Sequence, residues 1–196
     1  MENPSDFAFS DSVKAEQERL GSREIYARPH KGAGWDTTVT PARAEYIAAC
    51  DSFYIATASA EGQPYIQHRG GPKGFLKVLD EKTLAFAEYR GNRQYISMGN
   101  LKENDRCCLF LMDYPGRMRL KIWGRARFVE GDAELLAKVE DPEYGAKVER
   151  VFVFKVDVMD GNCPQHIQRR YTEDEVEDRV TGLKQQIKDC CPESEG

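Results

Sequence analysis

The sequence has no apolar run that approaches the roughly 20 residues of a transmembrane helix. Its first six residues are polar and acidic and are unlike a secretory signal peptide. The formal net charge is -5, so no overall positive field favours nucleic acid or an anionic membrane surface. Together these absences favour a cytoplasmic protein that binds neither nucleic acid nor membrane.

The cysteine pattern also excludes two kinds of stabilisation. No two of the six cysteines form a C-x-x-C pair, and four of them stand in two adjacent pairs. This spacing suits neither a zinc site nor a secreted disulfide framework, so we expect reduced thiols and no metal. The six are Cys50, Cys107, Cys108, Cys163, Cys190 and Cys191.

Short segments rich in β-branched and aromatic residues fill the middle of the chain. Turn signals such as Glu61-Gly62 and Tyr114-Pro115-Gly116 separate them. The pattern predicts a mainly β fold, a small antiparallel barrel or sandwich. The expected strands cover residues 52–58, 65–69, 75–79, 83–87, 106–112, 118–129 and 151–158.

Helices are expected before, between and after these strands. Thr40 followed by Pro41 is typical of a helix start. One apolar stripe predicts a helix over 92–102, and a narrower stripe predicts a charged helix over 171–189. The second stripe leaves two alternatives open: the helix lies on the barrel, or it pairs with a second copy of itself.

The domain organisation follows from these elements. Residues 1–40 are expected to form an N-terminal extension, 41–160 the barrel, and 161–196 a C-terminal segment with the charged helix. A glycine-rich stretch at 30–35 excludes regular structure there. It is either a surface arm or a segment that packs on a partner subunit.

Residues 88–94, Glu-Tyr-Arg-Gly-Asn-Arg-Gln, carry the clearest chemical signal. A strand ends, glycine makes the turn, and a helix is expected to begin. A helix N-terminus presents free N–H groups and the positive end of its dipole. With Asn92, Arg93 and Gln94 in its first turn, it would form an anion site. A solvated turn is the plainer interpretation of this segment alone.

Two further basic clusters flank this turn in the sequence. One combines His68, Arg69 and Gly70 with Lys73, and its glycines would let a flat ligand approach the backbone. The other alternates basic and apolar residues, so that Arg119 and Lys121 share one face of a strand. Each could equally be a hairpin connection or a solvated face. The sequence does not show whether the clusters converge.

The order and spacing of these clusters resemble the pyridoxamine 5'-phosphate oxidase-like FMN-binding split barrels. A weaker likeness, at 162–167, is to an uncharacterised branch of that family. The oxidases themselves end in an Arg-x-His-Asp-Arg stretch that holds the substrate phosphate, and this chain has none, so we do not expect the vitamin B6 enzyme. The stretches that carry the resemblance are 53–58, 62–64, 67–71, 83–86, 91–93, 99–101, 104–106 and 120–126.

The resemblance implies a six-stranded antiparallel split β-barrel, a homodimer, and FMN bound at the dimer interface. It places Arg69 beside the flavin and its phosphate. Asn92, Arg93 and Gln94 stand where the oxidases carry Ser-Arg-Lys, which makes Arg93 a phosphate ligand. Arg119 falls where the oxidases carry a glutamine that reaches FMN from the other subunit.

The resulting expectation is an FMN-dependent oxidoreductase that acts on a small-molecule substrate or electron donor. Lys73, Arg119 or Lys121 could place positive charge near the flavin ring, and His68 or His166 could handle protons. No nicotinamide fingerprint is present, so the chain could also work with a separate reductase. The alternative is a non-enzymatic flavin or haem binder or sensor, with His166 beside Cys163 as the candidate haem ligands.

Overall fold

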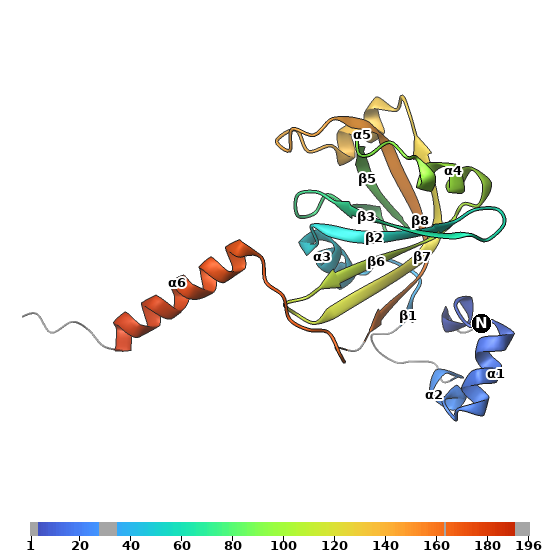
Figure 1. The fold of residues 1–196 in the computed structure, drawn as a ribbon, viewed down its shortest axis with the longest axis horizontal. Coiled ribbons are helices and arrows are strands. Elements are labelled where there is room, and N and C mark those ends of the chain that lie inside the picture. The colour runs from blue at the N-terminus through green and yellow to red at the C-terminus, as the bar shows by residue number, and fades with distance from the viewer. Residues whose placement is uncertain (1–3, 28–34, 163, 191–196) are drawn as a thin grey trace, which may run out of the picture.

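The computed structural model describes residues 4–27, 35–162 and 164–190, and its centre is a mainly antiparallel β sheet flanked by helices (Figure 1). The strands are β1 Trp35–Asp36, β2 Ser52–Ala58, β3 Pro64–Gly70, β4 Lys77–Asp80, β5 Thr83–Tyr89, β6 Arg106–Asp113, β7 Met118–Val129 and β8 Val148–Asn162. The helices are η1 Pro4–Phe7, α1 Asp11–Arg19, α2 Arg23–Ala27, α3 Pro41–Ala49, α4 Ile96–Glu103, α5 Ala133–Val139 and α6 Glu173–Cys190.

All strands belong to one sheet with the order β3-β2-β6-β7-β8-β5-β4, and β1 pairs with β8. Every pairing is antiparallel. The expected mainly β fold with flanking helices is confirmed, and it is consistent with a split barrel. The expected count of six strands was wrong, because the described residues form eight. Six is the count that the resemblance implied; the sequence pattern itself predicted seven strands, including one at 75–79 where β4 lies, and among the described strands it missed the two-residue β1.

The sheet curls until its two ends approach each other. Alternate residues of each strand point inward, as in β2, where Phe53 and Ile55 are fully buried. The Phe53 ring lies 5.5 Å from the ring of Phe86 on β5, although three strands separate β2 from β5 in the sheet order. We call the side on which β3 and β5 approach each other the seam.

Strands β7 and β8 are the longest, and their backbones lie close together at Gly124. The register shifts between Trp123 and Gly124, which marks a β-bulge. A Cβ atom at Gly124 would lie 2.0 Å from the carbonyl oxygen of Lys155 and 2.8 Å from the Phe154 ring. Only glycine fits at this position without movement of the backbone.

One of two predicted helix starts, that of α3, agrees with the structure, and the other, that of α4, does not. Thr40 caps α3 as expected, accepting a hydrogen bond from the backbone N–H of Arg43 at 3.3 Å. The expectation that a helix begins at residue 92 was wrong, because α4 begins at Ile96. Arg93 and Tyr95 both have positive φ angles, 63° and 54°, which a helical residue cannot adopt.

The N-terminal extension contacts the outer face of the sheet through aromatic rings. Trp35 stacks on Trp123 of β7 at 5.6 Å, and Phe9 meets the edge of Trp35 at 5.5 Å. Trp35 is thus the anchor of this extension. Residues 30–34 of the glycine-rich stretch lie outside the described residues, so its expected packing on a partner stays a prediction.

Two general expectations can be compared with the structure. Cys50, Cys107, Cys108 and Cys190, the cysteines among the described residues, are free thiols. Across the described ranges 4–27, 35–162 and 164–190, no helix has the length and apolar character needed to cross a membrane.

Replacing Gly124 with Ala should destabilise the fold by about 1–3 kcal/mol, because the added methyl group collides with the β8 backbone. Urea unfolding measures the change. Gly99→Ala in α4 is the matched control, since a Cβ there meets nothing within 4 Å. Equal stability of the two variants would show that the β7–β8 contact relaxes at little cost.

Candidate functional site

A buried ion pair crosses the seam. Nη2 of Arg69 on β3 lies 3.0 Å from Oε1 of Glu88 on β5, and the two side chains are only 15% and 14% exposed. The strands that carry them lie near opposite ends of the sheet order. The pair therefore joins the two ends of the curled sheet through side chains.

A second charged group lies beside this pair at the start of β8. Arg150, whose side chain is 10% exposed, lies 3.1 Å from Glu149 and 3.3 Å from Glu130. Its guanidinium also lies over the Tyr95 ring at 5.2 Å and contacts the Met98 sulfur at 3.0 Å. Strand β8 and the start of α4 thus hold a second arginine close to the first.

The remaining walls of the cleft come from α4 and the loop before it. Ser97 donates a hydrogen bond to Gln67 of β3 at 3.2 Å, which ties α4 to the seam. Asn92 accepts a hydrogen bond from the backbone N–H of Gln94 at 3.1 Å and so forms a tight turn. Arg93 is exposed and hydrogen-bonds to Tyr95.

These residues enclose a small cleft with incomplete hydrogen bonding. Nε of Arg69 and Oε2 of Glu88 are both buried without a hydrogen-bond partner. A buried donor left unpaired costs about 1–3 kcal/mol, and more when it is charged. An anionic oxygen placed in the cleft would satisfy Arg69 Nε, with Arg93 and Arg150 adding positive charge. The donor set therefore fits a phosphate group.

The size of the cleft limits which part of a ligand it can hold. Its volume is about 40 Å³, with Arg69, Glu88, Asn92, Arg93 and Arg150 among the lining residues. Ligand pockets for whole drug-sized molecules measure roughly 300–1,000 Å³. A phosphate group reaches into such a cleft, but a flavin ring would have to lie outside it.

Burial sets the protonation chemistry of Glu88. It raises the pKa of this carboxyl above its usual value, and the positive charges of Arg69 and Arg150 offset only part of that effect. The charge of Glu149 raises the pKa of Glu88 further. A second anion placed in the cleft would raise the pKa of Glu88 further.

The structure separates other expected site residues from this cleft. His68 directly precedes Arg69 on β3 and therefore points to the opposite, outer face, where it is exposed and its ring lies 5.6 Å from that of Tyr54. Gly70 shares that outer face as the partner of Ser52. Lys73 lies on a different cavity, of about 360 Å³, with Tyr46 and Cys50.

Arg119 and Lys121 also lie on the outer face of the sheet. Lys121 forms an ion pair with Asp160 at 2.9 Å and lies 5.3 Å from the Trp123 ring centre. Strand registers place one row of side chains across this face: His68, Tyr54, Phe110, Lys121 and Asp160. Within one chain, therefore, the three basic clusters do not converge on a single point.

Sequence reasoning missed four charged or amide side chains that line the cleft: Gln67, Glu88, Glu149 and Arg150. Glu88 begins the segment 88–94 that was predicted to form an anion site, but nothing in the sequence pairs it with Arg69, 19 residues earlier. The adjacent charges of Glu149 and Arg150 before a strand of Val and Phe were the available signal, since charged side chains are rarely buried unless paired.

Comparison with known proteins gives a family and a fold. The family model described as pyridoxamine 5'-phosphate oxidase matches residues 39–162. The match covers more than half of the chain, and the chain belongs to the pyridoxamine 5'-phosphate oxidase family. No curated protein matches the chain.

Solved structures agree with the fold at low sequence identity. Two crystal structures of HupZ from Group A Streptococcus, one of them a variant, are 17% and 18% identical, with TM-scores of 0.50 and 0.52. They cover 61% and 63% of this chain, and the chain covers 91% and 99% of theirs. A Clostridium acetobutylicum protein related to general stress protein 26 is 15% identical, with a TM-score of 0.47, covering 67% of this chain and 92% of its own.

Glu88→Gln should change the pH dependence of stability in a defined direction. Because the folded pKa of Glu88 is raised, its stabilising contribution is present below about pH 4.5 and is lost as the pH rises through the folded value. As the pH rises over this range, the unfolding free energy of the variant should therefore increase relative to that of the wild type, by about 1.4 kcal/mol for each unit by which the pKa is raised. Urea unfolding across a pH series measures the difference. If the wild type instead becomes more stable relative to the variant as the pH rises, the attraction to Arg69 lowers the pKa of Glu88 by more than burial raises it.

Proposed function

We propose that this chain is an FMN-binding flavoprotein that holds the flavin phosphate in the cleft at Arg69. The observation that carries the proposal is the buried Nε of Arg69, which has no hydrogen-bond partner in a cleft with Arg93 and Arg150. Membership of the pyridoxamine 5'-phosphate oxidase family supports the same assignment. Asn92 and Gln94 contribute by fixing the loop that carries Arg93.

The small volume of the cleft supports a site shared by two subunits. A ring system anchored by a phosphate in a cleft of about 40 Å³ extends onto the protein surface. Tyr54 and Ile66, 38% and 64% exposed, present apolar surface on the outer face of the sheet. We propose a homodimer formed through this face, which would cover the ring and bring His68, Arg119 and Lys121 into its surroundings.

The proposed activity is oxidation or reduction of a small molecule. Bound FMN would supply the electron transfer, and the chain would supply binding, orientation and charge. Arg69 and Arg93 would hold the phosphate and so fix the position of the ring. Lys121, on the outer face, is held by Asp160 at 2.9 Å and would present positive charge there.

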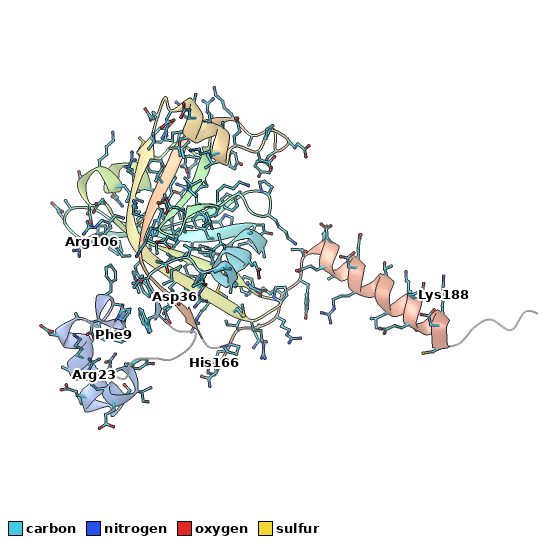
Figure 2. All side chains as sticks on the ribbon, turned by 180° about the vertical axis from the view of Figure 1, so that it is seen from behind. Phe9, Arg23, Asp36, Arg106, His166 and Lys188 are labelled. Carbon is cyan, nitrogen blue, oxygen red and sulfur yellow. The ribbon has the colours of Figure 1, made fainter. Side chains whose placement is uncertain are left out.

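A non-enzymatic binder of flavin or haem is the second candidate. Haem needs an axial ligand, and the candidate His166 is exposed in one chain (Figure 2). His68 is exposed on the outer face of the sheet. Cys163, the other expected haem ligand, lies outside the described residues. The visible spectrum of the purified protein separates flavin from haem directly.

Removing the arginine of the cleft should weaken binding of FMN but not of riboflavin, which lacks the phosphate. In Arg69→Gln/Glu88→Gln, both partners of the ion pair become neutral, so no charge is left buried and unpaired. We expect the Kd for FMN to rise by about one to two decades and the Kd for riboflavin to stay unchanged. Titration calorimetry measures both.

The matched control is Arg125→Gln, because Arg125 forms a half-exposed ion pair with Asp105 on the same sheet. It should leave both affinities unchanged. If the double variant weakens the binding of FMN and riboflavin equally, the FMN phosphate does not bind in this cleft. A chain that binds neither ligand would overturn the flavoprotein assignment.

A further inference from the structure

Helix α6 leaves the body of the protein (Figure 1). It exposes a stripe of apolar side chains. Val176, Val180, Leu183 and Ile187 are 46%, 42%, 59% and 66% exposed. The helix lies beyond the family match, which ends at residue 162. The stripe is therefore a feature of this chain that the proposed flavin site does not use.

The N-terminus of α6 is well capped, but a glycine in its middle lowers the stability of the helix. Thr172 accepts a hydrogen bond from the backbone N–H of Glu175, and Glu175 accepts one from the N–H of Thr172, which is a complete capping box. Gly182 in the middle costs about 1 kcal/mol relative to alanine. Most of the stability of a helix in a protein comes from packing of its apolar face, so α6 needs a packing partner.

We propose that α6 pairs with α6 of a second copy of the chain, antiparallel, as a short coiled coil. The apolar residues recur at spacings of four, three and four, which is the alternation of the two core positions of a heptad. The stripe is also symmetric about its midpoint. An antiparallel pair brings Val176 against Ile187 and Val180 against Leu183, so all four residues find apolar partners in both helices.

The charges that flank the stripe select the antiparallel direction. In that arrangement Glu177 lies beside the partner's Lys184, and the symmetry repeats this attraction. A parallel pair would instead place Arg179 beside the partner's Lys184, which is a repulsion repeated twice. The opposed helix dipoles of the antiparallel arrangement add to the preference.

The same charges disfavour a membrane as the partner. Residues 173–190 contain six acidic and three basic side chains. An anionic lipid surface repels such a helix, whereas interfacial helices are rich in Lys and Arg. The direction of α6 disfavours its own sheet, because Lys188 near its end lies far from the body of the protein (Figure 2).

Zero-length carbodiimide cross-linking of the full chain tests the contact. The reagent joins a carboxyl group and an amine only where they touch. Within one helix Glu177 and Lys184 are separated by about 10 Å along the axis, so a bond between them must join two chains. We expect this cross-link in the tryptic map. Cross-links from Lys184 to carboxyl groups of residues 35–162 would overturn the proposal.

Charge-reversal variants test the direction of pairing. The measurement is the hydrogen-exchange protection of the α6 backbone amides. Glu177→Lys and Lys184→Glu should each lower protection about tenfold, and the double variant should restore it. Asp178→Lys makes the same acidic-to-basic change as Glu177→Lys on the outward side of the helix and should have little effect. A rise in protection for Lys184→Glu alone would indicate parallel pairing and overturn the antiparallel model. FMN affinity should be the same in all variants, so this test is independent of the flavin proposal.

Discussion

The pairing of β7 with β8 carries the curvature on which the rest of the molecule depends. These two strands span 12 and 15 residues, and every other strand attaches to one or the other side of them. Their bulge at Gly124 lets the backbones approach closely while the pair bends. Without that bend β3 and β5 would lie far apart in an open sheet, with four strands between them, and the seam would not form.

The candidate site is a consequence of this closure. Side chains, rather than backbone hydrogen bonds, hold the two ends of the sheet together, and one of those contacts is a buried ion pair between Arg69 and Glu88. A buried pair contributes little net stability, since desolvation cancels much of the attraction. Its unsatisfied Nε and Oε2 atoms show that the pair is not optimised for stability alone. A ligand that accepts a hydrogen bond from Arg69 Nε would explain why this arginine lies at the seam with an unpaired donor.

Local signals predicted elements well, whereas the site depended on long-range geometry. The cap at Thr40 was correctly predicted because the cap and helix are neighbours in sequence. The start of α4 was not, because apolar spacing says nothing about the positive φ angles of Arg93 and Tyr95. The separation of Arg69 from His68 follows from strand alternation, but its contact with Glu88 requires knowing how far the sheet curls.

A crystal structure of the chain grown with FMN tests the central claim most directly. The account predicts a phosphate oxygen within hydrogen-bond distance of Arg69 Nε in every copy of the chain, with the flavin ring outside the cleft. A phosphate bound elsewhere, for example in the cavity beside Tyr46 and Cys50, would contradict it, as would crystals that stay colourless at saturating FMN.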